Sequence, residues 1–485
     1  MQTVSRDQST TVRYRTLFRH REFSALFCAD TASRAGGQLG KVALSVLVYE
    51  RTDSPGLAAA TFAISYLPGL IGGPVLGTLA DRLPRRALMI GCDLIRTGLT
   101  LAIASVPLPI PVALALLLVV ELIRSPFGAA RMAILADILH GERFTVGNAL
   151  VGASQQAVQV LGFGLGGFVV IALGPRPSLI AHAATYLISA LIVAALVRRR
   201  PAPRSGGVKT GLLGQTAEGI RVVARTRRMP TLFVLLFIGP TALGAAEGLA
   251  VPYGYELGGG QALGGMLLAA APLGAVFGLT AFGRMSAAAR ERRLLGSSLL
   301  VGLSIVVAGG APFLFGDSSP PIVLLALFTA GIAMGHMAHL QASIVQLTSP
   351  AIRGRVISLA NTVLHLGQAV SALGAGAAAE NGSVGAVLCW TGLAAGACTL
   401  AVGVFGAPYA ARHRAERRRA RRAAPVRHRA DPFDSRSRTE SGTGEGVRPT
   451  PVPGRTPPSP YRQYTPASVS GPRTPIRFPT QMTHR

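Results

Sequence analysis

Charged side chains are scarce in this chain. Asp, Glu, Lys and Arg make up 14% of its 485 residues, against about 25% in ordinary soluble domains. Hydrophobic residues make up 49%, and the mean hydropathy is +0.42. This composition excludes an ordinary soluble protein, and the length accommodates many apolar spans of about 20 residues each.

Lysine and cysteine are also rare. The only lysines are Lys41 and Lys209, so the formal net charge of +27 comes almost entirely from arginine. These arginines lie in loops between apolar segments and near the C-terminus, without the basic stripe and interleaved aromatics of a nucleic-acid-binding surface. The four cysteines stand singly, without disulfide or metal-ligand spacing, so we expect neither a nucleic-acid partner nor a metal site.

Catalytic and nucleotide-binding motifs are missing as well. Gly40-Lys41 lacks the first glycine and the Ser/Thr of a P-loop, and the G-x-G-x-x-G pattern at 162–167 lacks the preceding strand of a dinucleotide site. No nucleophile–base cluster stands out. We therefore expect no enzyme activity and no cofactor.

Twelve apolar segments fill residues 22–407, and their length predicts membrane-spanning helices. The expected spans are 22–49, 57–80, 87–106, 111–132, 145–173, 177–197, 230–253, 261–283, 294–316, 321–345, 355–380 and 383–407.

The basic residues follow every second span. Of the 48 Lys and Arg residues, 25 lie in the N-terminus and the even-numbered loops, with Arg131 and Arg355 at span ends counted with the adjoining loops. Another 2 lie in the odd-numbered loops, 4 inside spans and 17 after the last span. Because cytoplasmic loops carry the excess of Lys and Arg, we expect a multi-pass protein of the cell (inner or plasma) membrane with both termini cytoplasmic.

A long basic loop divides the spans six and six, which suggests a duplicated bundle. The C-terminal segment is rich in Pro, Ser, Thr and Arg, so we expect it to be disordered. It would either attract anionic lipid or only set topology. The expected parts are the N-terminus 1–21, a first bundle 22–197, a central loop 198–229, a second bundle 230–407 and a tail 408–485.

The loop after the second span carries the most specific motif. It reads Gly77-Thr-Leu-Ala-Asp81-Arg82-Leu-Pro84-Arg85-Arg86 and resembles the G-x-L-A-D-R-x-x-R-R loop of the major facilitator superfamily. Further stretches, such as Asn148-Ala-Leu, are similar to its drug- and siderophore-exporter branch, which includes macrolide efflux proteins and the enterobactin exporter. The resemblance implies an all-α membrane protein with twelve transmembrane helices in two pseudo-symmetric six-helix bundles.

The resemblance also implies a conformational latch. Gly77 would let two spans pack closely, and Asp81 would face a helix N-terminus and pair with nearby arginines, Arg131 among them. Pro84 stands where the family has glycine. The residues expected to form the latch are Gly77, Asp81, Arg82, Arg85, Arg86 and Arg131.

The fifth span carries a glycine motif, Gly162, Gly166 and Gly167. It resembles the family's antiporter motif G-P-x-x-G-G, with Phe163 in place of proline. The substitution weakens the implication of antiport without removing it.

Ionisable residues inside the spans are the candidates for function, because a charge in hydrocarbon costs at least ~2.5 kcal/mol. They concentrate in spans 1, 4, 7 and 10, which line the central cavity in the family. Lys41, near one end of span 1, is expected only to extend to the membrane surface. The expected cavity and proton-coupling residues are Asp30, Arg34, Glu121, Arg124, Glu247, His336 and His339.

Asp30 is our first choice of proton carrier and Glu121 the second. Asp30 and Arg34 lie at i, i+4 and Glu121 and Arg124 at i, i+3, so each pair shares a helix face. A structural salt bridge is the alternative for both pairs, and a structural hydrogen bond the alternative for Glu247. Under the first choice, Asp30→Asn abolishes coupled flux in a folded protein.

These features favour a secondary active transporter. We expect proton-coupled export of an amphipathic small molecule such as an antibiotic, siderophore or secondary metabolite. Uptake by a symporter or uniporter is one alternative, and a non-transporting receptor or scaffold is another. The expected partners are the small-molecule substrate, protons and the lipid bilayer, with the protein a monomer.

Overall fold

The computed structural model describes residues 14–68, 82–200, 220–226, 228–349 and 352–423. All elements in these ranges are helical. Gly77 and Asp81 lie outside them.

The first group of helices comes from the N-terminal half. The Ser54 hydroxyl accepts a hydrogen bond from the backbone N–H of Leu57 at 3.0 Å and caps helix α3. Gly174, with a φ of 84°, makes the tight connection between α8 and α9. The elements are α1 (Tyr14–Phe18), α2 (Arg21–Thr52), α3 (Pro55–Leu67), α6 (Arg85–Ser105), α7 (Ile110–Ile138), α8 (Glu142–Leu173) and α9 (Pro175–Leu196).

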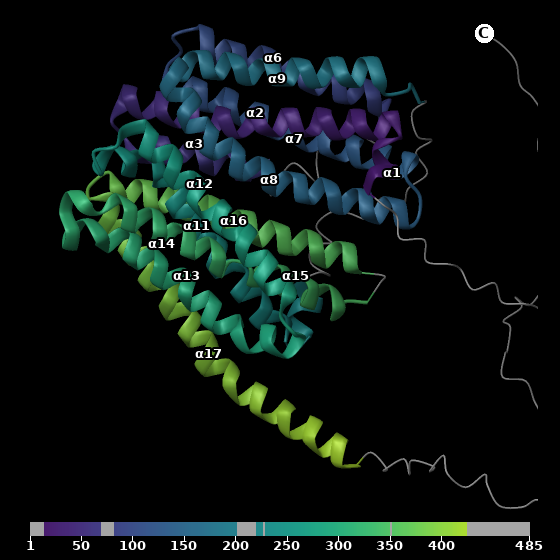
Figure 1. The fold of residues 1–485 in the computed structure, drawn as a ribbon, viewed down its shortest axis with the longest axis vertical. Coiled ribbons are helices and arrows are strands. Elements are labelled where there is room, and N and C mark those ends of the chain that lie inside the picture. The colour runs from purple at the N-terminus through teal and green to yellow at the C-terminus, as the bar shows by residue number, and fades with distance from the viewer. Residues whose placement is uncertain (1–13, 69–81, 201–219, 227, 350–351, 424–485) are drawn as a thin grey trace, which may run out of the picture. The chain divides into compact units, whose positions relative to one another are not determined.

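The second group comes from the C-terminal half, and Figure 1 shows it as the green part of the ribbon beside the purple and blue first group. Its elements are α11 (Met229–Glu256), α12 (Gly260–Arg284), α13 (Ala287–Phe315), the 3-10 turn η2 (Gly316–Ser318), α14 (Pro320–Ala333), α15 (His336–Gln346), α16 (Arg353–Ala379) and α17 (Val384–Ala423).

Each of the twelve expected spans corresponds to a helix of the structure, with α14 and α15 together forming the tenth. Within the described residues, 10 helices are long and apolar enough to cross a membrane, with α14 and α15 counted as one. Helix α2 has 32 residues and carries Asp30, Arg34 and Lys41, and α3 is an apolar helix of 13 described residues. The all-α fold with two six-helix bundles is therefore confirmed.

The tenth span differs from the continuous helix that we expected. It breaks after Ala333, and α15 begins at His336. The break lies where α12 comes close, since a Cβ at Gly335 would lie 2.4 Å from the carbonyl oxygen of Gly278. The two backbones can pack this closely only because both positions are glycine.

The last helix corrects the expected start of the tail. We expected disorder from residue 408, but α17 continues to Ala423. This extension is rich in alanine and arginine, which are strong helix formers, so the composition that predicted disorder also supports a helix. The rest of the expected tail lies outside the described residues.

The two bundles share one apolar core. A single cluster of buried side chains includes Phe62 and Phe163 from the first bundle and Leu249 and Leu267 from the second. Contacts between the bundles run mainly through α3 with α16, α8 with α12, and α3 with α11. The core therefore lies along the interface between bundles.

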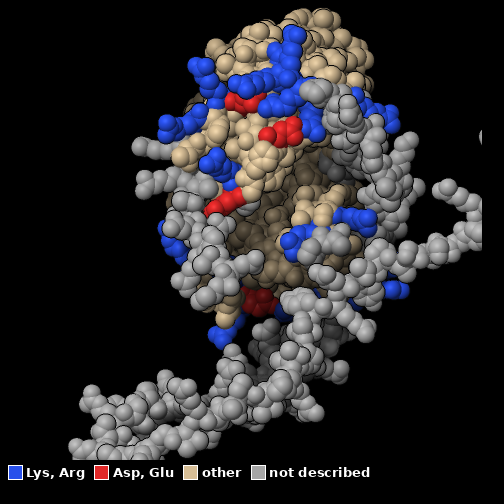
Figure 2. All heavy atoms as spheres, turned by 90° about the vertical axis from the view of Figure 1, so that its right-hand side faces the viewer, with Lys and Arg blue, Asp and Glu red and all other residues tan. Residues whose placement is uncertain are grey.

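The arginines gather at one end of the bundles. Successive helices run antiparallel, so the helix ends next to Arg85, Arg143, Arg200, Arg228 and Arg353 fall on the same side. We call this end the arginine face, and Figure 2 looks onto it.

Candidate functional site

A cavity of about 520 Å³ lies within the helices. Its lining comes mostly from α2, α3, α6, α7 and α8 of the first bundle, while α16 of the second bundle contributes Leu364, His365 and Gln368. Figure 2 shows the arginine face hollowed between blue side chains. The volume is in the range of small-molecule sites.

The two bundles contact each other at the end opposite the arginine face. The carboxylate of Glu380, after the last residue of α16, accepts a hydrogen bond from the backbone N–H of Gly56 at 2.9 Å and another from the Ser54 hydroxyl. The Tyr255 hydroxyl donates to Glu50 at 3.0 Å, again between bundles. The cavity therefore opens toward the arginine face.

Asp30 is held by two arginines. Its Oδ2 atom lies 2.8 Å from Nε of Arg34 and 2.9 Å from a terminal nitrogen of Arg131. Asp30 and Arg131 are both buried, at 4% and 7% exposure. The expected pair with Arg34 is present, and the contact with Arg131 joins α2 to α7.

Glu121 is held more loosely. Its Oε2 atom lies 3.5 Å from Arg124. This buried oxygen accepts no hydrogen bond from the described residues, although Glu121 lines the cavity. The Arg124 side chain is 39% exposed. Glu121 is thus the cavity carboxylate that is better placed to exchange partners.

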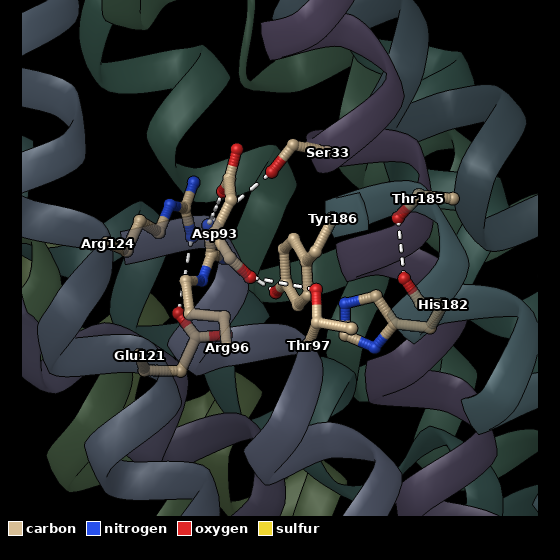
Figure 3. A network of polar contacts seen from close by, with 9 residues as sticks. All are labelled: Ser33, Asp93, Arg96, Thr97, Glu121, Arg124, His182, Thr185 and Tyr186. Carbon is tan, nitrogen blue, oxygen red and sulfur yellow. Dashed lines mark hydrogen bonds and ion pairs between the residues drawn. The ribbon is translucent and has the colours of Figure 1, made fainter. Parts of the chain in front are cut away.

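A third ion pair joins α6 to the cavity (Figure 3). Arg96 lies 3.5 Å from Asp93, donates to Ser33 at 3.4 Å and to the Tyr186 hydroxyl at 2.6 Å, and stacks on the Tyr186 ring at 3.8 Å. These contacts connect α6 with α2 and α9. Arg96 and Tyr186 line the cavity, a role that the sequence analysis did not assign to them.

Lys41 has a different place from the one expected. It lines the cavity rather than only reaching the membrane surface. Its ammonium nitrogen lies 5.9 Å from the centre of the Tyr66 ring. Within the described part of the chain, Lys41 forms no ion pair and no hydrogen bond. The α2 face that carries Asp30 and Arg34 continues to Lys41, because steps of three and four residues stay on one face.

Glutamine side chains complete the polar lining. Gln38, Gln155, Gln159 and Gln368 all face the cavity. Gln155 and Gln159 lie at i, i+4 in the fifth span, so their spacing on one helix face was a usable signal. Gln368 offered no comparable signal, since α16 contains several polar residues at other registers.

Three predicted residues lie outside the cavity lining. Glu247 accepts a hydrogen bond from the Tyr66 hydroxyl, which joins α11 to α3. His336 is fully buried, with Nδ1 2.7 Å from the carbonyl of Ala333. His339 lies 3.4 Å from Glu291. The structure therefore separates these three side chains from the Asp30 and Glu121 pairs.

The glycine motif of the fifth span lies at helix contacts. A Cβ at Gly162 would lie 2.7 Å from Cβ of Gln38, and one at Gly167 would lie 2.8 Å from Cα of Gly265. Gly166 faces Leu39 and Val42 at ordinary distances. The motif thus lets α8 pack on α2 within its bundle and on α12 across the interface.

The described latch arginines make contacts inside the first bundle. Arg85 forms an ion pair with Asp137 at 2.6 Å, and Arg86 donates to carbonyl groups at the end of α9. Arg82 is exposed. Arg131, which we expected near Asp81, contacts Asp30. The expected contacts of Gly77 and Asp81 fall outside the described residues.

The chemistry available in this cavity is ion pairing, hydrogen bonding and proton exchange. Among the described residues, no group of three or more His, Cys, Asp or Glu side chains is placed to hold a metal ion. Carboxylates inside a membrane domain, paired with arginines and open to a cavity, are typical of substrate and proton pathways.

Known proteins are similar to this chain in sequence and in architecture. The sequence is 24% identical over 234 residues to the uncharacterized MFS-type transporter YkuC of Bacillus subtilis, a match that spans 46% of this chain and 54% of YkuC. It is 24% identical over 356 residues to the multidrug efflux pump Tap of Mycobacterium tuberculosis, which covers 71% of this chain and 83% of Tap. A solved POT family transporter in complex with a thioalcohol-conjugated peptide has a TM-score of 0.62 at 14% identity, covering 80% of this chain and 96% of that one.

One family's sequence model matches most of the chain. The sequence model described as Major Facilitator Superfamily matches residues 26–372 and, in a second match, 248–459. These ranges contain every residue that lines the cavity. The chain therefore belongs to the Major Facilitator Superfamily and is a multi-pass membrane transporter, with ten helices among its described residues long and apolar enough to span a membrane.

Proposed function

We propose that the protein exports a small organic molecule from the cytoplasm in exchange for protons. The observation that carries the proposal is the partly free carboxylate of Glu121 in a cavity that opens toward the arginine face. Basic loops are retained in the cytoplasm, so this face is the cytoplasmic one and both chain termini lie there. The structure then corresponds to an inward-open state, ready to load substrate from inside the cell.

Export requires the cavity to change sides. The bundles rock around the central site, so the contacts that Glu380 and Tyr255 make across the interface separate, and the arginine face closes. The glycine contact between α8 and α12 provides a close, smooth surface on which the bundles can move.

Glu121 couples substrate flux to proton flux, because its Oε2 atom can bind either the substrate or a proton. When Glu121 is ionised, Oε2 can accept a hydrogen bond from a donor group of the substrate. When Oε2 carries a proton, it becomes a hydrogen-bond donor and no longer accepts from the substrate, so substrate and proton compete for this atom. Mutually exclusive binding in an alternating-access carrier produces antiport.

Asp30, our first choice from the sequence, fits a structural role better. Both of its arginine contacts are short and buried, and they tie α2 to α7. We assign the proton to Glu121 and the α2–α7 connection to Asp30. The polar lining also favours a more polar substrate than the amphipathic compounds that we expected.

Uptake by symport is the second candidate, because Phe163 stands where the antiporter motif has proline. Phe163 is buried, with its ring 6.4 Å from that of Phe62. Export is favoured by the similarity to Tap, which is named as an efflux pump.

Purified protein in proteoliposomes tests the direction. We would impose a pH gradient, add a panel of antibiotics, siderophores and polar metabolites, and follow lumenal pH together with labelled solute. Antiport predicts that solute and protons move in opposite directions. Movement of both in the same direction would establish symport instead.

A further inference from the structure

Four of the five cationic side chains around the cavity have a carboxylate partner. Arg34 and Arg131 share Asp30. Arg96 pairs with Asp93, and Arg124 with Glu121. The fifth cation, Lys41, forms no ion pair within the described residues.

Two further carboxylates could in principle neutralise Lys41. Glu121 also lines the cavity, but its ion pair is with Arg124. Glu247 accepts a hydrogen bond from the hydroxyl of Tyr66. Glu121 and Glu247 both attract Lys41 electrostatically, but neither forms an ion pair with it. Lys41 contacts the face of the Tyr66 ring instead. The region therefore holds five cations and four carboxylates, Asp30, Asp93, Glu121 and Glu247, and Lys41 is the cation without an ion pair among the described residues.

A cation without an ion pair is costly at this depth in a bilayer. A bound anionic group would offset that cost through a charge-assisted hydrogen bond. The neighbouring surfaces suit such a ligand. Gln38, three residues before Lys41, and Gln368 line the same cavity, and each carries an amide NH2 group that can donate a hydrogen bond to an anion.

We propose that the substrate is a small organic anion whose carboxylate, or a similar acidic group, binds to Lys41. The substrate then carries two recognised features, an anionic group at Lys41 and a hydrogen-bond donor at Glu121. The inference rests on the proposed transport function and adds the chemical class of the substrate. Exchange of such an anion for a proton moves negative charge out and positive charge in, and an inside-negative membrane potential drives both movements.

Matched compounds test this class directly. We would measure binding of a panel of aromatic and aliphatic carboxylates to purified full-length protein, each beside its uncharged primary amide. We expect the acids to bind about tenfold or more tightly, the usual scale of one charge-assisted hydrogen bond. Equal affinity of acid and amide throughout the panel would overturn the proposal.

Variants at Lys41 assign the effect to this residue. Lys41→Gln is expected to abolish the preference for the acid, whereas Lys41→Arg retains it. Arg176→Gln removes one positive charge from an exposed site outside the cavity lining and is expected to change nothing. A preference for acids that persists in Lys41→Gln would contradict the assignment.

A substrate-independent measurement covers the case in which Lys41→Gln folds poorly. The four native cysteines are replaced by alanine, and Ser125→Cys places one thiol in the cavity lining. An anionic methanethiosulfonate is expected to label this thiol faster than a cationic one of similar size, after normalisation to free cysteine. Preferential labelling by the cationic reagent would overturn the proposal.

The transport assay separates this inference from the function on which it rests. Proton antiport with neutral or cationic compounds alone would refute the anionic substrate and leave export standing. Acids that bind through Lys41 but move no protons would refute the coupling and leave the anion site standing.

Discussion

The Glu380 carboxylate accepts a hydrogen bond from the backbone N–H of Gly56 at 2.9 Å, across the interface between the bundles. Gly56 lies in the first turn of α3, where a carboxylate is stabilised by the helix dipole. Close packing supports the contact, because a Cβ at Gly376 would lie 3.0 Å from Cα of Gly56. This contact holds the cavity closed at the end opposite the arginine face.

Removing the Glu380 carboxylate should therefore favour opening at that end. Charge-assisted hydrogen bonds contribute about 1.5–3 kcal/mol, so Glu380→Ala should reduce the ratio of inward-open to outward-open protein by roughly tenfold. Distances between spin labels on the ends of α3 and α16 would report the change. Asp317→Ala, which removes a carboxylate from η2, serves as the control. An unchanged distance distribution in Glu380→Ala would contradict the assignment.

The ion pairs of Asp30 predict a stability effect rather than a specific coupling effect. Asp30→Asn leaves Arg131 buried without its carboxylate, which costs about 3–5 kcal/mol when a buried pair is broken. We expect a clear fall in the Tm of the purified protein, and partial recovery in Asp30→Asn combined with Arg131→Met. Glu121→Gln, where the pair is longer and Arg124 is more exposed, should change Tm little. A Tm equal to that of the unmodified protein in Asp30→Asn would show that the pair is not structural.

The contact of Gly167 with Gly265 predicts a sensitive position on α8. Gly167→Ala places a methyl group 2.8 Å from the Cα of Gly265, so α8 and α12 must separate. We expect transport to fall several-fold and Tm to decrease. Gly152→Ala on the same helix, where a Cβ meets nothing within 4 Å, is the matched control. Similar activity in the two variants would rule out a role for close packing.

His339 lies apart from the cavity and pairs with Glu291. His339→Gln should therefore preserve the number of protons moved per substrate, because no cavity group loses its partner. The measurement is the ratio of proton to solute flux in proteoliposomes. A changed ratio would restore the sequence-based expectation that His339 takes part in coupling.

Local features of the chain were predictable from the sequence. Hydropathy predicted the helices because a bilayer selects apolar segments of fixed length. The pairs of Arg34 with Asp30 and of Arg124 with Glu121 followed from helical spacing.

Contacts between distant segments were not predictable in the same way. Asp30 and Arg131 are 101 residues apart, and Gly56 and Glu380 are 324 apart. Such pairs depend on how whole helices pack. The position of His336 was misjudged for a related reason, since the span breaks at Gly335 and the register of one continuous helix does not apply. Lys41 was expected to extend outward, although it faces the same cavity as Asp30.

The most direct test of the account compares two fluxes in Glu121→Gln proteoliposomes. For a substrate found with the unmodified protein, we would measure exchange of labelled for unlabelled substrate at equal pH on both sides, and substrate-driven proton movement under a pH gradient. We predict that Glu121→Gln retains exchange, because its amide oxygen can still accept the hydrogen bond of the substrate and the Lys41 site is intact. We predict that it loses proton movement, because an amide does not take up a proton. Proton movement at the unmodified rate in Glu121→Gln would contradict the assignment of Glu121 as the proton carrier.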